Sequence, residues 1–185
     1  FSSKCIINKQ LPGCGFTEYC IGGPENVILC SPRKMLLKNK KDQHEFDVYL
    51  VVNEMDKESN IDKDLSKVDK NTNLDAELDE KFMDNNSEIY KRLYREIEEY
   101  CTSRSINGLP CKILVTYDSY RIVKDILEKL DRFYTFYTIV DEFQSILHDS
   151  RFKSDTELKF LEYLKQSPTA YFVSATPMMD EYLEM

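Results

Sequence analysis

The loop at residues 12–17, Pro-Gly-Cys-Gly-Phe-Thr, has the glycines and the hydroxyl of a phosphate-binding loop but not its lysine. In the usual form, G-x-x-x-x-G-K-[ST], backbone N–H groups bind phosphates, the lysine reaches the terminal phosphates and the hydroxyl holds Mg²⁺. Phe16 stands in the lysine position, and Thr17 supplies the hydroxyl. The residues expected to bind a nucleotide are Pro12, Gly13, Cys14, Gly15, Phe16 and Thr17.

Two acidic residues follow an apolar run in the segment 139–144, Ile-Val-Asp-Glu-Phe-Gln. An acidic residue at the tip of a buried strand is where nucleotide-bound Mg²⁺ is held, together with the loop hydroxyl. Asp141 is therefore expected to share Mg²⁺ with Thr17, and Glu142 is expected to orient or deprotonate an attacking water. A strand end whose acids are merely solvated is the alternative.

Hydroxyl side chains follow a second apolar run, at Ser174 and Thr176 on either side of Ala175. Hydroxyls at a strand tip often only satisfy backbone groups in a turn, so this segment is weak evidence by itself. Its order and spacing relative to the loop at 12–17 and to Asp141 are harder to explain by chance. The three segments together indicate one site.

Alternating strands and helices are predicted around these segments. The predicted strands cover residues 5–7, 27–30, 46–52, 112–116, 137–140 and 170–173. The predicted helices cover 17–21, 33–41, 87–103, a segment capped by Ser119, and 156–164. This alternation is typical of an α/β fold with a mainly parallel sheet covered by helices on both faces. In such sheets ligands bind beyond the carboxyl ends of the strands, which is where every segment above falls.

Composition excludes several classes of protein. No apolar run approaches the roughly 20 residues that span a bilayer, and the start does not look like a signal peptide. The six cysteines form no C-x-x-C pair and only two histidines exist, which favours reduced thiols over a disulfide or metal framework. We therefore expect a cytoplasmic protein without membrane contact.

The acidity of the chain is local. Its net charge is −8, but residues 54–88 hold twelve Asp or Glu and five Lys, which leaves about −1 for the rest. Residues 53–86 contain no Gly or Pro and show weak helical spacing, so we interpret about 53–88 as an acidic, partly helical insertion. The charge of the remaining surface does not exclude a nucleic-acid partner.

The three segments resemble the motifs of the first RecA-like domain of superfamily 2 helicases of the DEAD/DEAH-like kind. Residues 13–17 take the place of motif I, residues 141–144 that of motif II in a DExQ form, and residues 174–176 that of motif III. The resemblance implies a RecA-like P-loop fold, ATP and Mg²⁺ as cofactors, and DNA or RNA as a partner. It also implies that Glu142 and Gln144 are catalytic, and that the coupling residues are Ser174, Ala175 and Thr176.

Two further segments fit the resemblance less specifically. Arg33 and Lys34 lie where the family's motif Ia contacts the nucleic-acid backbone, and Lys34, Lys38 and Lys41 recur at helical spacing as a basic stripe suited to phosphates. A solvated helix face is the alternative for that stripe.

Residues 115–118 stand where motif Ib is expected, without its usual glycine and arginine. Thr116 and Tyr117 are the residues there that are expected to contact nucleic acid, and Tyr117 has a ring that can stack on a base. Packing within the protein is the alternative for Tyr117.

Phe16 weakens the expected chemistry because it has no donor for a phosphate. A charge-assisted hydrogen bond contributes about 1.5–3 kcal/mol, so its loss is expected to impair ATP binding and, still more, hydrolysis. Lys9 and Lys4 are candidate substitutes. The family's second RecA-like domain, which supplies an arginine for phosphoryl transfer, is expected in the same or another chain, because residues 1–185 are interpreted as a fragment.

Two functions are compatible with these observations. The first is the ATP-binding domain of a nucleic-acid-dependent NTPase of the helicase or translocase type, impaired by Phe16. The second is a non-catalytic binding or scaffolding module that keeps the P-loop fold. The segments at 141–144 and 174–176 favour the first, and Phe16 favours the second.

Overall fold

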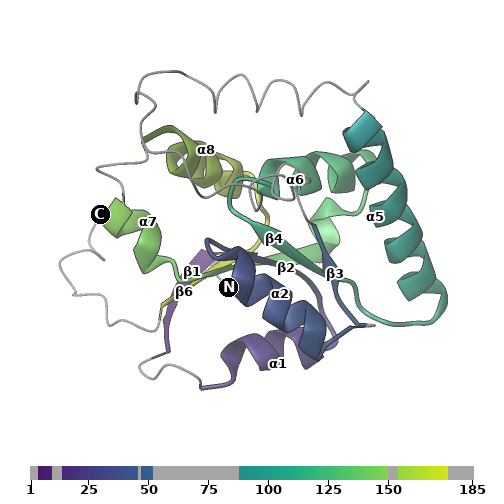
Figure 1. Ribbon diagram of the computed structural model, residues 1–185, viewed down its shortest axis with the longest axis horizontal. Coiled ribbons are helices and arrows are strands. Elements are labelled where there is room, and N and C mark those ends of the chain that lie inside the picture. The colour runs from purple at the N-terminus through teal and green to yellow at the C-terminus, as the bar shows by residue number, and fades with distance from the viewer. Residues whose placement is uncertain (1–3, 10–13, 46, 52–87, 150–153, 175–185) are drawn as a thin grey trace, which may run out of the picture.

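The computed structural model describes residues 4–9, 14–45, 47–51, 88–149 and 154–174 (Figure 1). Within these residues the strands form one parallel sheet in the order β1-β6-β5-β2-β4-β3. The strands are β1 (Lys4–Asn8), β2 (Asn26–Ser31), β3 (Tyr49–Leu50), β4 (Lys112–Thr116), β5 (Phe136–Asp141) and β6 (Ala170–Ser174).

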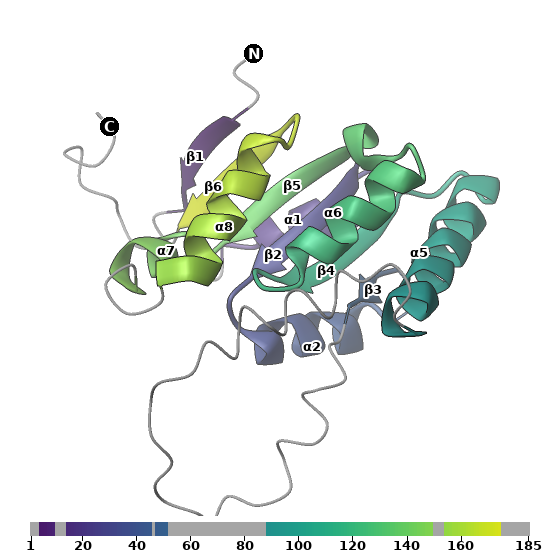
Figure 2. The ribbon, with the colours of Figure 1, turned by 90° about the horizontal axis from the view of Figure 1, so that it is seen from above.

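Helices cover both faces of this sheet, as Figures 1 and 2 show. The helices are α1 (Phe16–Gly22), α2 (Lys34–Gln43), α5 (Glu88–Ile106), α6 (Tyr120–Lys129), α7 (Gln144–Asp149), α8 (Ser154–Lys165) and the short 3₁₀ helix η1 (Phe133–Thr135). Helices α1 and α2 lie on one face, and α5, α6 and α8 lie on the other. The α/β, RecA-like architecture predicted from the sequence is confirmed.

The strands are buried on both faces, and alternate residues feed two separate cores. In β2, Val27 and Leu29 pack with α1 and α2, whereas Ile28 and Cys30 pack with α5, α6 and α8. Successive side chains of a strand point to opposite faces, so a strand covered on both sides needs an unbroken apolar run. This is why the sequence predicted the central strands well.

Aromatic rings fill much of the core on the α6 and α8 side. Phe160 of α8 stacks on Tyr117 at the end of β4, with ring centroids 4.5 Å apart, and meets the edge of Tyr120 at 5.3 Å. Such arrangements are favoured by the charge distribution of aromatic rings. They fix α8 over the carboxyl half of the sheet.

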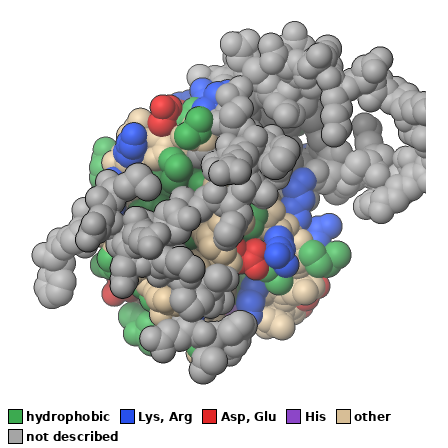
Figure 3. Space-filling model, turned by 90° about the vertical axis from the view of Figure 1, so that its left-hand side faces the viewer, with side chains coloured by type: hydrophobic (Ala, Val, Ile, Leu, Met, Phe, Trp, Pro, Cys, Tyr) green, Lys and Arg blue, Asp and Glu red, His purple; other side chains and the backbone are tan. Residues whose placement is uncertain are grey.

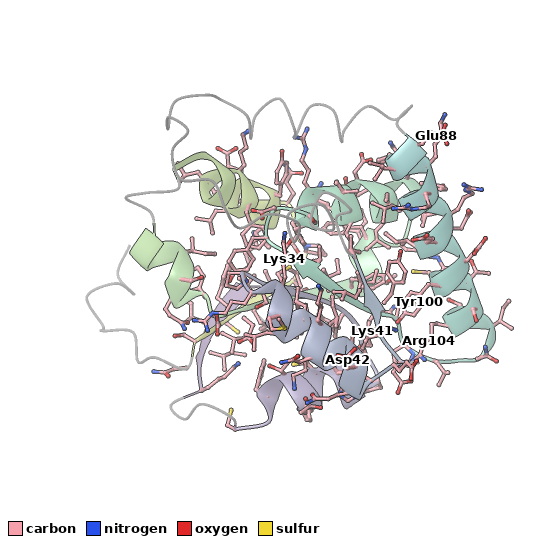
Figure 4. The ribbon with its side chains drawn as sticks, viewed as in Figure 1. Lys34, Lys41, Asp42, Glu88, Tyr100 and Arg104 are labelled. Atoms are coloured by element: carbon pink, nitrogen blue, oxygen red, sulfur yellow. The ribbon has the colours of Figure 1, made fainter. Side chains whose placement is uncertain are left out.

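Helix α5 is tied to the segment that follows α2. Tyr100 donates a hydrogen bond to the Asp47 carbonyl (2.9 Å), and the Arg104 guanidinium lies 3.1 Å from the Asp47 carboxylate. Figure 4 shows both side chains on the side of α5 that faces the end of α2. These contacts set the position of β3 and the outer side of the sheet.

Lys112 is almost fully buried at the amino end of β4. Its ammonium donates hydrogen bonds to the carbonyls of Cys20 (2.8 Å), Gly23 (2.9 Å) and Glu25 (2.5 Å). These carbonyls belong to the end of α1 and the turn after it. The helix that follows the loop is therefore fastened at its far end to a central strand.

Several predicted boundaries differ from the structure. The strand predicted at 46–52 is reduced to Tyr49–Leu50 within its described part, and α7 was not predicted. Ser119 occupies the cap position of α6, but its hydroxyl makes no capping hydrogen bond and accepts one from the Thr116 hydroxyl instead (3.3 Å). The insertion at about 53–88 lies outside the described residues except for Glu88, where α5 begins.

Candidate functional site

Strand register places the segments singled out in the sequence at one edge of the sheet. Asn8 pairs with Ser174 and Val173 pairs with Asp141, so the carboxyl ends of β1, β6 and β5 are level, with β6 in the middle. The end of β2 lies beside β5, because Cys30 pairs with Val140. Residues distant in the sequence therefore meet at this edge.

Asp141 is the centre of the cluster. Its Oδ1 atom accepts a hydrogen bond from the Lys9 ammonium at 2.6 Å, and its Oδ2 atom accepts one from the Thr17 hydroxyl at 3.2 Å. The side chains of Lys9 and Asp141 are only 11% and 18% exposed. A partly buried pair is screened less than a surface pair, and the lysine, the hydroxyl and the carboxylate thus form one compact group.

The backbone of Asp141 is also fixed. Its carbonyl accepts a hydrogen bond from the Tyr117 hydroxyl at 2.6 Å, and its Oδ1 atom also accepts one from the N–H of Glu142 at 3.0 Å. Burial raises the pKa of Tyr117 well above its ordinary range, so the phenol stays protonated and remains a donor. The strand tip is held from β1, α1 and β4 together.

Lys9 is the candidate substitute that lies beside Phe16. The Lys9 ammonium lies 5.7 Å from the centre of the Phe16 ring, and that ring packs on the core beneath α1 and α2. The other candidate substitute, Lys4, lies at the opposite end of β1 and donates to the Lys165 carbonyl (2.7 Å). Of the two candidates, the structure brings Lys9 to the site and not Lys4.

The part of the loop that is described makes a tight turn into α1. Gly15 has φ +80°, a left-handed conformation that favours glycine, and its carbonyl accepts a hydrogen bond from the N–H of Tyr19 at 2.8 Å. Cys14 is exposed beside it. Pro12 and Gly13, which were also expected to bind the nucleotide, lie outside the described residues.

Glu142 turns the chain at the end of β5 and is paired with Arg33. Its φ is +56°, an uncommon conformation for a residue other than glycine. Its Oε2 atom lies 3.1 Å from the Nε atom of Arg33, which precedes α2. The predicted water-activating carboxylate and a predicted nucleic-acid contact therefore touch each other.

The remaining residues of the predicted coupling group are only partly described. Gln144 begins α7, and its side-chain oxygen is buried without a hydrogen-bond partner among the described residues. Ser174 is fully buried at the end of β6, while Ala175 and Thr176 lie outside the described residues. The catalytic role expected of Gln144 and the coupling role expected of Ser174, Ala175 and Thr176 stay predictions.

The predicted basic stripe on α2 is shorter than expected. Lys34 and Lys38 are exposed, but Lys41 donates to the carbonyls of Glu45 and Val48 (2.7 Å to Val48) and so closes the end of α2. Figure 4 shows Lys34 at the start of α2 and Lys41 toward its end, and Figure 3 shows Lys and Arg side chains on the right-hand part of one face, the side on which α2 lies.

Thr116 and Tyr117 do not form a surface for nucleic acid. Both are buried, and the Tyr117 ring is covered by Phe160 of α8. Tyr117 is therefore not available to stack on a base, and the packing role is the one that the structure shows. A tyrosine at a strand end fits either role by sequence alone, because the ring that covers it belongs to a later helix.

The oxygen atoms at this edge suit Mg²⁺ only together with a phosphate. Among the described residues, no three His, Cys, Asp or Glu side chains gather as a metal site. Asp141 and Thr17 offer one carboxylate and one hydroxyl, and Mg²⁺ in nucleotide sites is bound by one or two carboxylates plus substrate phosphates. The donor set fits a Mg²⁺ ion that arrives with a nucleotide.

Comparison of the chain with protein-family models, curated proteins and solved structures finds no match. The assignment of a function thus depends on the geometry of the site.

Within the described part of the chain, no helix has the length and apolar character needed to cross a membrane. All six cysteines carry free thiols.

Proposed function

We propose that this chain is the ATP-binding domain of a helicase-like, nucleic-acid-dependent NTPase. The observation that supports the proposal best is the cluster of Lys9, Asp141 and Thr17 at the carboxyl ends of β1 and β5. It contains the cation, the acid and the hydroxyl that nucleotide hydrolysis requires. The cation comes from the end of β1 and not from the loop position that Phe16 fills.

In this proposal Lys9 exchanges one anionic partner for another. Its ammonium now neutralises Asp141, and the terminal phosphates of ATP offer it a stronger negative charge at the same edge. Thr17 and Asp141 would hold a Mg²⁺ ion, whose charge would offset that of the phosphates. Glu142 orients the attacking water and accepts its proton. Gln144, Ser174 and Thr176 couple the nucleotide to the nucleic acid.

The proposed partners occupy two further surfaces. Arg33, Lys34 and Lys38 precede or lie on the exposed side of α2 and are the residues proposed to contact nucleic-acid phosphates. A second RecA-like domain, in the same or another chain, supplies the arginine that completes phosphoryl transfer. Without that domain, slow turnover is expected.

A non-catalytic P-loop module is the second candidate function. One observation favours it: both carboxylates at the tip of β5 already have cations from the same chain, Lys9 on Asp141 and Arg33 on Glu142. A ligand must displace these pairs before the acids can act. A module that binds a nucleotide without hydrolysing it needs only the Lys9–Asp141 pair to be displaced.

Two measurements on the full-length protein test the proposal. Hydrolysis of ATP is followed with and without single-stranded DNA or RNA, in the native protein and in Glu142→Gln, with Glu98→Gln on α5 as a charge-matched control. Turnover that Glu142→Gln abolishes and Glu98→Gln preserves supports the enzyme. Binding of a fluorescent ATP analogue without turnover supports a non-catalytic nucleotide-binding module, and absence of binding overturns every function that requires ATP.

A further inference from the structure

We propose that nucleic-acid phosphate and Glu142 compete for the guanidinium of Arg33. Arg33 is then a positioning residue: while it binds Glu142 it withholds that carboxylate from the attacking water, and when it binds a phosphate it frees the carboxylate. The catalytic part of this inference rests on the proposed function, whereas the competition itself is independent of hydrolysis.

The fold makes this contact a consequence of strand order. Strand β2 is the neighbour of β5, and their paired residues place the end of β2 beside the tip of β5. Arg33 follows β2 by two residues and immediately precedes α2, while Glu142 follows β5 directly. The left-handed turn at Glu142 sharply redirects the chain at this point. Two loops from adjacent strands therefore present opposite charges to each other.

The chemistry of the contact explains why Glu142 is restrained. Its Oε2 atom lies 3.1 Å from the Arg33 Nε atom, an ion pair that places the guanidinium where a water would otherwise approach that oxygen. Glu142 is 24% exposed, so it has limited freedom to turn elsewhere. A water bound at that oxygen must first displace the guanidinium.

The exposure of Arg33 explains why a phosphate can displace Glu142 from its guanidinium. The Arg33 side chain is 70% exposed, and ion pairs in such positions contribute little stability because water competes for both charges. A guanidinium also binds phosphate oxygens through two parallel N–H groups. Lys34 and Lys38 are exposed on the helix that Arg33 precedes. Their positive charges raise the local concentration of nucleic acid near Arg33.

Competition of this kind must be reciprocal. If phosphate binding weakens the hold of Arg33 on Glu142, then removal of the Glu142 charge strengthens phosphate binding by the same factor. Because the Arg33 side chain is largely exposed, the factor is expected to be about two- to fivefold. This half of the proposal can be measured without any nucleotide.

The test measures the affinity of fluorescein-labelled single-stranded DNA and RNA 20-mers by anisotropy at fixed salt. We expect Glu142→Gln to bind about two- to fivefold more tightly than the native protein, and Arg33→Ala to bind more weakly. The double variant is expected to match Arg33→Ala. Asp42→Asn, at an exposed position near the other end of α2 (Figure 4), removes the same charge and is expected to leave affinity unchanged.

Three outcomes overturn the competition. Glu142→Gln binds the 20-mers no more tightly than the native protein, or Glu142→Gln increases the affinity equally when Arg33 has been replaced by alanine, or the native protein binds neither 20-mer. Circular dichroism of each variant separates these outcomes from misfolding. Where ATP turnover is present, Arg33→Ala is expected to raise the rate without nucleic acid and to reduce the stimulation by nucleic acid. A fall of both rates overturns the positioning role, whereas absence of turnover in the native protein overturns only the enzyme proposal.

Discussion

The ammonium of Lys9 lies 5.7 Å from the centre of the Phe16 ring, within the distance at which a cation is attracted to an aromatic face. The residue that fills the lysine position of the loop therefore supports a lysine from the end of β1. The same ammonium reaches Asp141 at 2.6 Å. The cluster around Asp141 therefore contains a cation, although the loop at residues 12–17 contains none.

Replacement of Lys9 by alanine is expected to weaken binding of a fluorescent ATP analogue by about tenfold or more, since charge-assisted hydrogen bonds contribute about 1.5–3 kcal/mol. Lys4→Ala is the matched control, because Lys4 lies at the other end of β1, where it donates to the Lys165 carbonyl of α8. Phe16→Lys in the Lys9→Ala background is expected to restore affinity in part. Equal affinity of Lys9→Ala and native protein would contradict the role of Lys9.

Thr17→Val is expected to remove the part of nucleotide affinity that depends on Mg²⁺. The Thr17 hydroxyl lies 3.2 Å from Asp141 Oδ2, and valine has the same shape without the oxygen. The affinity for a fluorescent ATP analogue is measured in Mg²⁺ and in EDTA. We expect the ratio of the two affinities to fall severalfold in Thr17→Val and to be kept in Thr17→Ser. A magnesium effect of native size in Thr17→Val would show that the metal is bound elsewhere.

Tyr117→Phe is expected to destabilise the fold by about 1 kcal/mol, the usual net contribution of a hydrogen bond. The change removes the donor to the Asp141 carbonyl but keeps the ring that stacks on Phe160. Urea unfolding measures the loss, with Tyr134→Phe, at a ring that is 71% exposed, as the control. If both variants unfold at the same urea concentration as native protein, the tip of β5 does not depend on this bond.

Lys112→Met is expected to cost at least about 2 kcal/mol of unfolding free energy, because each buried acceptor left without a donor costs about 1–3 kcal/mol. Burial lowers the pKa of Lys112, but three carbonyls accept hydrogen bonds from its amino group. Lys91→Met, at an exposed position on α5, is the control. A loss no larger than that of the control would mean that water replaces the ammonium without cost.

Glu18 joins α1 to α2 and gives the fold a pH-dependent contribution. Its carboxylate binds Lys40 and His44, and Lys40 in particular holds the pKa of Glu18 below its ordinary value. A depressed carboxyl pKa adds stability above the unfolded value of about 4.3, and this stability is lost as the pH falls through the folded pKa. The site is exposed, so the contribution stays below about 1 kcal/mol.

The check compares urea unfolding of native protein and Glu18→Gln at several pH values. Their difference is expected at pH 7 and is expected to shrink as the pH falls through the lowered pKa of the folded Glu18 carboxyl. Glu99→Gln on α5 serves as the charge-matched control. A difference that grows on acidification has the wrong sign for this carboxylate.

The sequence predicted the strands at the site because burial on both faces leaves an apolar run, unbroken in residues 27–30 and interrupted only by Thr138 in residues 137–140. It also predicted that Asp141 lies at the end of a strand and that Thr17 lies at the start of a helix. It did not predict α7, because a six-residue helix offers too few turns for a periodic pattern. The Ser119 cap failed because the hydroxyl bonds to Thr116 instead.

The pairings at the site depend on strand order, which sequence patterns do not specify. Lys9 reaches Asp141 only because β6 alone separates β1 from β5, and Arg33 reaches Glu142 only because β2 borders β5. Lys9 was one of two candidate lysines, and the sheet decides between them. The loss of Lys41 from the basic stripe likewise follows from local carbonyls that no spacing rule reveals.

The strand that leads to Lys9 lies at one edge of the sheet. Among the described strands β1 pairs with β6 alone, whereas β5 lies between β6 and β2. Segments with fewer partners open locally at a lower free energy, so the amide protons of Lys4–Asn8 are expected to exchange with deuterium before those of β5. A ligand that binds only the closed form suppresses that opening in proportion to its occupancy. Deuterium uptake along β1 therefore reports how full the site is, whether or not any bond is broken there.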